Sequence, residues 1–224
     1  MSTVEQKPNV KFQSVTILSN SEISPNVFVL SFKRNFDFRA GQVLGLAMST
    51  ADDARLYSIA SGDSDENINI LYNIKPGGKL TPNLAALQQG DTLWITVPFG
   101  TYAGSAEPAY WIAAGTGIAP FMSMYRSGLG DGKTLLHGSR TLDGFYFSEQ
   151  LVNDFGDRYV RCCSGQEGKG VYHGRVTQYL ENSNDLPSDQ KYYLCGSAEM
   201  VVECREILLN KGISFSNIVA EIYF

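Results

Sequence analysis

The sequence contains only four cysteines and two histidines, and it has no uninterrupted apolar run of about 18 residues that could cross a membrane. Cys162, Cys163, Cys195 and Cys204 show no CxxC or Cys/His spacing that would hold zinc or an iron–sulfur cluster, so we expect reduced thiols and no metal site. The first residues carry neither a secretory nor a transit pattern. The formal net charge of −5 does not favour binding to nucleic acid or to anionic membranes. We therefore expect a cytoplasmic protein without nucleic-acid or membrane partners.

The 224 residues are 43% hydrophobic, which is enough to fold as one large or two compact domains. Residues 10 to 100 read as short β-prone runs between turn signals, and this pattern favours a small antiparallel β-barrel or sandwich. One short helix is expected at Thr81–Gln88, with Thr81 as its cap and Pro82 at its first position. The predicted strands are Val10–Leu18, Val27–Phe32, Gln42–Ala47, Leu56–Ile59, Ile68–Ile74 and Leu93–Val97.

After Gly100 the predicted strands and helices alternate, which is the pattern of a parallel sheet covered by helices. We expect a barrel domain at 1–104 and a five-stranded α/β nucleotide-binding domain at 105–224, with the boundary near Tyr102 to Pro108, where glycine, serine and proline cluster. The predicted strands are Tyr110–Ala114, Lys133–His137, Arg158–Cys163, Lys191–Cys195 and Ile218–Ile222. The predicted helices are Ala119–Tyr125, Phe147–Phe155, Arg175–Glu181 and Ala198–Leu209.

A glycine-rich turn at Gly115-Thr-Gly117 joins an apolar strand to a helix that Pro120 opens. Such glycines let backbone N–H groups approach a pyrophosphate, although strand–helix turns also use glycine for steric reasons alone. The next predicted strand leads to Arg140, near the position where a dinucleotide site binds the ribose. An arginine there suits a 2′-phosphate and favours NADP(H); a solvated arginine at a strand end is the alternative.

The first half of the chain offers two possible phosphate contacts. Arg55 lies close to Ser58, and a Gly77-Gly78 turn leads into the predicted helix at Thr81. Tyr57 could present a ring for stacking. Each feature also has a structural explanation, with Tyr57 in the core and the glycines in a hairpin turn.

Five motifs in order resemble the ferredoxin–NADP reductase family, specifically its compact bacterial branch of ferredoxin or flavodoxin reductases. The resemblance extends from Val10 to the end of the sequence. The motifs are Arg55-x-Tyr57-Ser58, Gly77-Gly78-Lys79-Leu80-Thr81, Gly115-Thr-Gly-Ile-Ala-Pro-Phe121, Cys195-Gly196-x-x-x-Met200 and Glu221-x-Tyr223-Phe224.

The resemblance implies an FAD site on the barrel. Arg55 would pair with the FAD pyrophosphate, Tyr57 would stack on the isoalloxazine, and Ser58 would lie beside flavin N5. The other residues implied to bind FAD are Tyr72, Gly78, Lys79, Leu80, Thr81 and Phe224.

The resemblance also implies an NADP(H) site on the second domain. The pyrophosphate turn would be Gly115, Thr116 and Gly117, and Cys195 and Met200 would form the wall of the nicotinamide pocket. This sequence departs from the family at Gly165, where the bacterial branch has an arginine for the 2′-phosphate. The residues that remain available to the adenosine half are Ser139, Arg140, Ser164, Tyr172 and Arg175, with Tyr172 available for adenine stacking. We expect NADPH to be preferred over NADH, with shallower discrimination than in the family.

Four residues are expected to carry the chemistry. Ser58 and Cys195 are small enough for the nicotinamide to reach N5, and Glu221 could supply a hydrogen bond or a proton route. Tyr223 would cover the flavin face that the nicotinamide uses, and would act as a gate.

The implied function is that of a ferredoxin (or flavodoxin)–NADP reductase, which transfers hydride between NADP(H) and FAD and exchanges single electrons with a carrier protein. The sequence does not determine the oligomeric state, although a monomer is favoured. A cluster of Lys33, Arg34 and Arg39 could steer an acidic carrier or simply be solvated. One alternative is an NAD(P)H-dependent flavin reductase or oxygenase reductase component of the same fold. Another is a nucleotide-binding module without redox activity.

The remaining candidates have ordinary explanations. His137 and His173 lack a partner spacing for metal or triad chemistry, so structural or surface roles are expected. Because neighbouring side chains of a strand point to opposite faces, one of Cys162 and Cys163 should be buried and the other half exposed.

Overall fold

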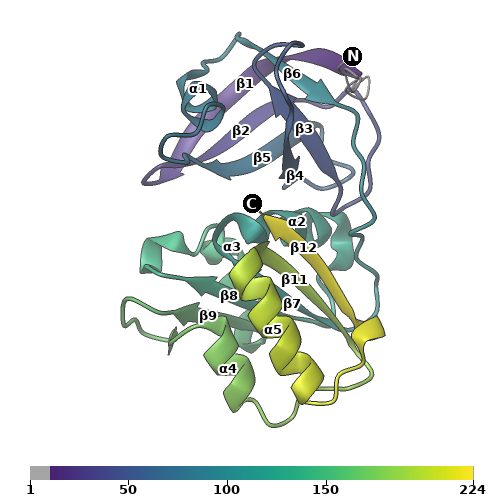
Figure 1. Ribbon diagram of the computed structural model, residues 1–224, viewed down its shortest axis with the longest axis vertical. Coiled ribbons are helices and arrows are strands. Elements are labelled where there is room, and N and C mark those ends of the chain that lie inside the picture. Colours follow the sequence, from purple (N-terminus) through teal and green to yellow (C-terminus); the bar gives the residue numbers. More distant parts are fainter. Residues whose placement is uncertain (1–10, 224) are drawn as a thin grey trace, which may run out of the picture.

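The computed structural model describes residues 11–223, which form two domains stacked along the long axis of the molecule (Figure 1). The first domain is a six-stranded antiparallel sheet with strand order β4-β3-β6-β1-β2-β5. A bridge between Ile59 and Ile70 joins the end of β4 to β5, and so closes the sheet into a barrel around an aliphatic core. Its elements are β1 (Phe12–Ser24), β2 (Val27–Lys33), β3 (Val43–Ala47), β4 (Arg55–Ser58), β5 (Asn67–Asn73), α1 (Thr81–Ala86) and β6 (Thr92–Thr96).

The second domain is a six-stranded parallel sheet with strand order β10-β9-β8-β7-β11-β12. Its strands are β7 (Ala109–Ala114), β8 (Lys133–Ser139), β9 (Tyr159–Cys163), β10 (Tyr172–His173), β11 (Lys191–Ser197) and β12 (Ile218–Tyr223). Its α-helices are α2 (Ala119–Met124), α3 (Ser148–Phe155), α4 (Val176–Asn182) and α5 (Ala198–Asn210), and its short 3₁₀ or π turns are η1 (Gly115–Ile118), η2 (Tyr125–Leu129), η3 (Leu142–Gly144), η4 (Gly156–Arg158) and η5 (Phe215–Asn217).

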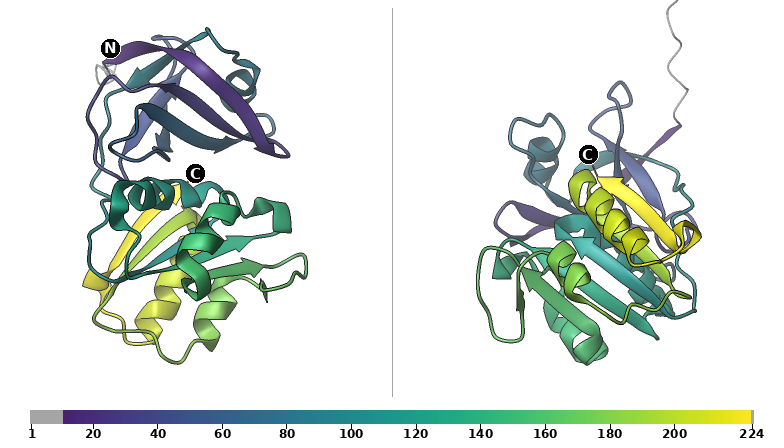
Figure 2. Two further views of the ribbon diagram at one scale, coloured as in Figure 1. Left: turned by 180° about the vertical axis from the view of Figure 1, so that it is seen from behind. Right: turned by 60° about the horizontal axis from the view of Figure 1, so that its bottom comes forward.

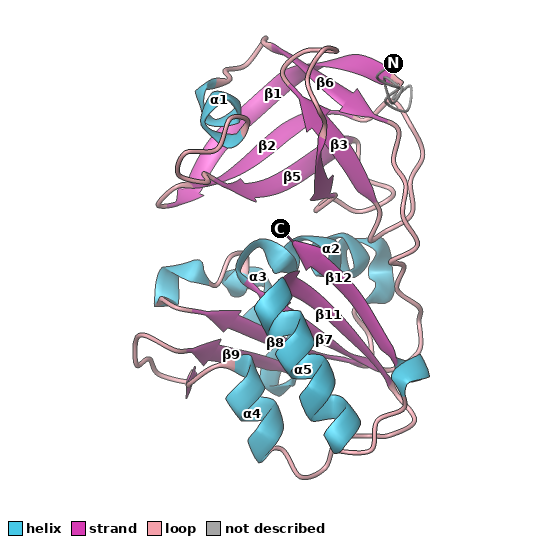
Figure 3. Cartoon of the chain, in the orientation of Figure 1, coloured by secondary structure: helices cyan, strands magenta, loops and turns pink. Residues whose placement is uncertain are grey.

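Helices cover both faces of the parallel sheet, as its near-continuous apolar strands require. One core contains residues of α2 and α3, and the other contains residues of α4 and α5. Figure 3 shows α4 and α5 in front of the sheet, and the reverse view in Figure 2 brings α3 to the front. The two-domain architecture of barrel plus α/β domain is thus confirmed.

The structure corrects two strand predictions. The parallel sheet has six strands rather than five, because Tyr172 and His173 pair with Cys162 and Cys163. A two-residue strand is too short to show any periodicity. The first strand runs on to Ser24 through polar residues, paired with β2, whereas the prediction ended it at Leu18; Val10 lies outside the described residues.

Two predictions about side chains were also wrong. Thr81 is not the helix cap: Leu80 occupies that position without a side-chain bond, and the Thr81 hydroxyl accepts a hydrogen bond from the Lys75 N–H at 2.8 Å. Cys162 and Cys163 are both fully buried, because helices and loops cover both faces of β9. All four cysteines are free and buried. Among residues 11–223, no helix has the length and apolarity needed to span a bilayer.

Candidate functional site

The carboxyl ends of β7, β11 and β12 point at the barrel, next to β4 (Figure 1). Cys195 lies beside Ala113 of β7 and Glu221 of β12, and Tyr223 follows at the end of β12. In parallel α/β sheets, ligands bind outside the carboxyl ends of the strands. The domain border is therefore the expected place for a reaction site.

Four predicted residues meet at this border. Ser58 donates a hydrogen bond to Glu221 Oε2 at 2.8 Å, and the Tyr223 hydroxyl donates to Ser58 Oγ at 2.7 Å. The Cys195 sulfur lies 3.9 Å from the same Glu221 oxygen. The cluster therefore links the barrel to the ends of β11 and β12 through one serine hydroxyl.

Burial sets the protonation of this cluster. Burial raises the pKa of Glu221, and the hydrogen bonds from Ser58 and Cys195 lower it in part. Burial, followed by the charge of Glu221, raises the pKa of the Cys195 thiol well above its ordinary value. Burial likewise raises the pKa of the Tyr223 phenol. At neutral pH the thiol and the phenol are therefore uncharged, and Glu221 holds a proton more readily than an exposed carboxyl does.

Tyr102, in the segment between the domains, was not predicted as a site residue. Its ring packs edge-on against Tyr193 at 5.8 Å, and its buried hydroxyl has no hydrogen-bond partner among the described residues. Burial raises the pKa of this phenol, and the charges of Cys195 and Glu221 add to the effect. A tyrosine in a glycine-rich connection gives no local sign of such a position.

The predicted dinucleotide turn forms η1. Gly115 has φ +55° and open space where a Cβ would lie, so its backbone is accessible. A Cβ on Gly117 would lie 2.2 Å from the Cys195 carbonyl oxygen, so only glycine allows the turn to pack against the end of β11. The glycines therefore bring a turn, half buried at Gly115 and Thr116, next to Cys195, as binding of a pyrophosphate beside a nicotinamide pocket requires.

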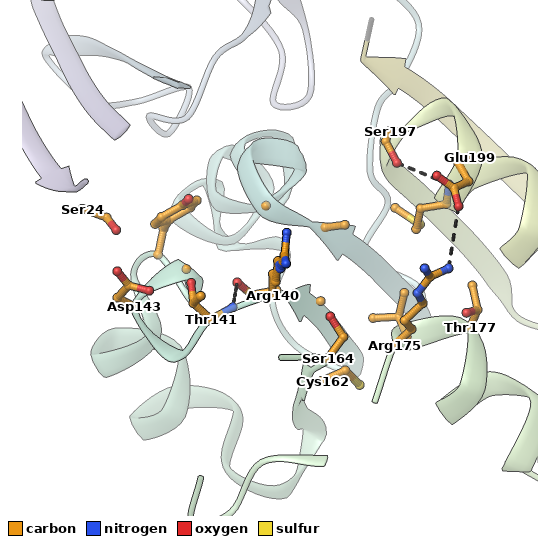
Figure 4. Close-up of a pocket in the computed structure, with 18 of the residues that line it drawn as sticks. Ser24, Arg140, Thr141, Asp143, Cys162, Ser164, Arg175, Thr177, Ser197 and Glu199 are labelled. Atoms are coloured by element: carbon orange, nitrogen blue, oxygen red, sulfur yellow. Dashed lines mark hydrogen bonds and ion pairs between the residues drawn. The ribbon is translucent and has the colours of Figure 1, made fainter. Parts of the chain in front are cut away.

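A pocket of about 620 Å³ adjoins this turn (Figure 4). Its lining includes Ser139, Arg140, Ser164, Arg175 and Met200. Figure 4 shows Arg140 near its centre and Arg175 turned toward Glu199. The size of this pocket and its polar lining fit the adenosine half of a dinucleotide.

Two predicted features of the adenosine site look different in the structure. A Cβ on Gly165 would lie 2.5 Å from the Arg140 carbonyl oxygen, so the backbone contact with Arg140 accounts for glycine at this position. Tyr172 is not among the residues that line the pocket, and its ring packs edge-on against Tyr179 at 5.3 Å. Arg140 and Arg175 are the arginines that line this pocket, so they are the side chains that could pair with a phosphate there.

The barrel presents the predicted flavin residues on β4. Arg55 is exposed and Tyr57 is half buried, with its ring edge-on to Tyr72 at 6.4 Å, and burial raises the pKa of Tyr57 to about 12. Tyr72 itself is buried in the barrel core and donates to Asn20 Oδ1 at 3.0 Å. Tyr72 therefore supports the Tyr57 ring from inside the barrel, and its predicted contact with FAD stays a prediction.

The second flavin motif forms a turn before α1. Gly77 adopts φ +72° with open space around it, and the Gly78 N–H donates to the Lys75 carbonyl at 2.8 Å. Lys79 is exposed, and the buried Thr81 hydroxyl holds the turn from inside. An exposed arginine, a half-buried ring and an open glycine turn with a lysine fit the pyrophosphate and ring of FAD. Phe224 lies outside the described residues.

Comparison with known proteins agrees with an FAD site on the barrel and a dinucleotide site on the α/β domain. An oxidoreductase FAD-binding domain matches residues 14–103, and an oxidoreductase NAD-binding domain matches residues 111–206. The crystal structure of a ferredoxin NADP+ reductase from Neisseria gonorrhoeae with bound FAD and NADP has the same fold, with a TM-score of 0.86 and 21% identity over 96% of this chain and 99% of that one.

Curated relatives include two kinds of reductase. The reductase component of propane 2-monooxygenase from Mycolicibacterium goodii is 30% identical over 74% of this chain and 53% of its own length. The ferredoxin–NADP reductase of Azotobacter vinelandii is 26% identical over 89% of this chain and 90% of its own length. The chain spans about half to two thirds of the oxygenase reductase components that it matches. With both domain models matched in order, the chain belongs to the ferredoxin reductase family, as an FAD-binding domain followed by an NAD(P)-binding domain.

Proposed function

We propose that this protein is a ferredoxin (or flavodoxin)–NADP reductase, which transfers hydride between NADP(H) and FAD and exchanges electrons with a separate carrier protein. The observation that carries the proposal is the Ser58–Glu221–Tyr223 cluster with Cys195, at the border of an FAD-binding and an NAD(P)-binding domain. When bound, FAD accepts hydride at N5 and can release electrons one at a time.

The residues of the chain would orient the two rings. Tyr57 offers a ring on the barrel side, and Ser58 offers one small hydroxyl at the border. Cys195 is small and uncharged, so it allows a nicotinamide to approach without introducing a fixed charge. The Tyr223 hydroxyl is hydrogen-bonded to Ser58, and the Tyr223 ring must move before a nicotinamide ring can take its place. This supports a role of Tyr223 as a gate to the flavin.

We also propose a preference for NADPH over NADH. Arg140 lies in the adenosine pocket, where the Arg175 guanidinium makes ion pairs of 3.7 Å to Glu199 and 3.9 Å to Glu203. These side chains are largely exposed, and such pairs contribute little. A 2′-phosphate could therefore displace them from Arg175. The two carboxylates also repel a phosphate, which supports shallow discrimination.

The alternative is a reductase component that serves an oxygenase, as several relatives are named. The match to the Azotobacter vinelandii ferredoxin–NADP reductase covers nine tenths of both chains and favours the first proposal. The two readings differ in the electron acceptor and in the nicotinamide used, so both can be measured.

The test begins with the visible spectrum of the purified protein, followed by anaerobic titration with NADPH and, on a fresh sample, with NADH. A yellow protein that releases FAD, is bleached faster by NADPH and then reduces ferredoxin or flavodoxin supports the proposal. Equal bleaching by NADH and rapid reduction of free flavin would favour the alternative. A protein that binds no flavin would refute both, and would indicate a nucleotide-binding module without redox activity.

A pair of serine variants makes the test specific. Ser58→Ala removes the hydroxyl that joins Glu221 and Tyr223, and should slow reduction of bound FAD about ten-fold with FAD retained. Ser61→Ala is the control, because Ser61 is equally buried and its hydroxyl accepts from the Asn69 N–H within the barrel. Equal rates in both variants would contradict the role of Ser58.

A further inference from the structure

A second group of contacts joins the two domains, away from the Ser58 cluster. The guanidinium of Arg126 donates to the Ala60 carbonyl oxygen at 3.1 Å, and the Asp63 N–H donates to Ser127 Oγ at 2.9 Å. Arg126 and Ser127 lie on η2, directly after α2, and Ala60–Asp63 continues the chain after β4. In Figure 1, α2 lies at the border between the domains. We call these four residues the clamp.

The backbones meet as closely as the side chains. A Cβ on Gly62 would lie 2.9 Å from the Arg126 carbonyl oxygen, so glycine at this position lets the loop of the barrel touch η2. η2 is a π-type helical turn that is interrupted at Gly128, where φ is +80°. Turns of the π type are rare in proteins. Those that occur are often found at functional sites.

The side chains of Arg126 and Ser127 each make a second contact within their own domain. The Arg126 guanidinium lies 5.4 Å from the centre of the Phe147 ring, and Ser127 Oγ donates to the Ser123 carbonyl at 2.8 Å. The Ser127 hydroxyl thus donates within its helix and accepts across the border. Preorganised side chains hold a position at low entropic cost, so these contacts can define the distance between the domains.

We propose that Arg126 and Ser127 are positioning residues that hold Ser58, and the flavin beside it, at hydride-transfer distance from the nicotinamide site. Ala60 is two residues after Ser58, and η2 ends the helical segment that starts at the Gly115 turn. The clamp therefore ties the residues next to the flavin position to the element that holds the dinucleotide. This inference rests on the proposed hydride transfer.

The Ser58 cluster loses one of its two hydrogen bonds to Ser58 during turnover. Tyr223 must leave Ser58 when a nicotinamide enters, so at the moment when distance matters Ser58 keeps its hydrogen bond to Glu221 alone from this cluster. None of the four residues of the clamp is placed in a cofactor contact, so the clamp can persist during the reaction. Reacting atoms must approach to about 3–3.5 Å, and an error of about 1 Å can cost on the order of a hundred-fold in rate.

The chain offers a closely matched control for Arg126. Arg158 donates to the Lys133 carbonyl at 2.8 Å and lies 5.3 Å from the centre of the Phe155 ring, so it makes the same two kinds of contact within one domain. The variants to compare are Arg126→Ala, Arg158→Ala, Ser127→Ala and the conservative Arg126→Lys.

Three readouts apply to the FAD-loaded protein. Rapid mixing with NADPH gives the rate of flavin reduction, and the long-wavelength charge-transfer absorbance reports how the two rings overlap. The third readout is the distance distribution between spin labels on Gln89→Cys in the barrel and Asn184→Cys in the α/β domain. Both positions are exposed, and all four native cysteines are buried, so labelling is selective.

We expect Arg126→Ala to broaden the label distances, to weaken the charge-transfer absorbance and to slow reduction about ten-fold, with FAD content unchanged. Ser127→Ala should act in the same direction by about three-fold, and Arg126→Lys should recover part of the rate. Arg158→Ala should change thermal stability alone. Unchanged label distances in both Arg126→Ala and Ser127→Ala would overturn the inference, as would equal slowing by Arg158→Ala. If wild-type protein is not reduced by NADPH, the proposed function fails, whereas the label distances still decide whether the clamp sets the domain geometry.

Discussion

Removal of the Tyr223 contact should tighten nicotinamide binding by an amount that the structure bounds. Tyr223→Phe removes one hydrogen bond of 2.7 Å to Ser58, worth about 1 kcal/mol, or roughly five-fold in affinity. Tyr223→Ser also removes the partly buried ring. Half of an aromatic side chain hides on the order of 100 Å², which is about 2.5 kcal/mol, so the ring and the hydrogen bond together set a ceiling of roughly 300-fold.

The assay is a difference-spectrum titration of the oxidised FAD-loaded protein with NADP+, for wild type and both variants. Affinity should rise in the order wild type, Tyr223→Phe, Tyr223→Ser. The control is Tyr192→Phe, which removes a tyrosine hydroxyl bond of 2.9 Å to Pro187 in the core on the α4 and α5 side of the sheet. Equal affinity in all four proteins would show that Tyr223 does not occupy the nicotinamide position, and would refute the gate.

Three further predictions concern charge. Burial lowers the pKa of His137 from 6.5 to about 4, so the stability that neutral His137 contributes is full above pH 6.5 and is lost as the pH falls toward 4. In urea unfolding, the free energy of unfolding of His137→Gln should therefore fall by about 3 kcal/mol less than that of wild type between pH 6.5 and pH 4. Burial raises the pKa of Glu221, so its protonated form contributes stability below pH 4.5 that is lost as pH rises through the folded pKa; Glu221→Gln should raise the Tm at pH 8 and leave it unchanged at pH 4. The double change Glu199→Gln and Glu203→Gln should free Arg175 and tighten NADPH a few-fold at low salt without changing NADH affinity; equal effects on both would contradict the 2′-phosphate assignment.

Local patterns predict the regular elements well because burial imposes a period on them. In three strands the apolar residues of the sequence lie on the buried faces, as their spacing predicts. These strands are Val27–Lys33, Ala109–Ala114 and Lys191–Ser197. The polar second half of β1 could not be predicted in this way, because pairing with β2 holds it in place rather than an apolar face. The same applies to Tyr172–His173, whose pairing depends on the neighbouring strand.

The candidate site could likewise be predicted only in part from the sequence. Ordered motifs predicted that Ser58, Cys195, Glu221 and Tyr223 would meet, since each motif ends a strand at the same border. The sequence carries no signal for Tyr102, because its position depends on packing between segments far apart in the chain. Contacts across the domain border depend on how the two domains are placed relative to each other, and no local period in the sequence records that placement.

The Ser58 hydroxyl has a single proton, which limits the hydrogen bonds that it can donate. In the structure this proton goes to Glu221, and the hydroxyl oxygen accepts from Tyr223. A hydroxyl donates one hydrogen bond at a time, so a flavin nitrogen that accepts from Ser58 must compete with the Glu221 carboxylate. Protonation of Glu221 weakens it as an acceptor and frees the Ser58 proton, and burial makes that protonation easier than for an exposed carboxyl. We therefore expect the entry of nicotinamide, the departure of Tyr223 and the proton on Glu221 to be coupled through the Ser58 hydroxyl.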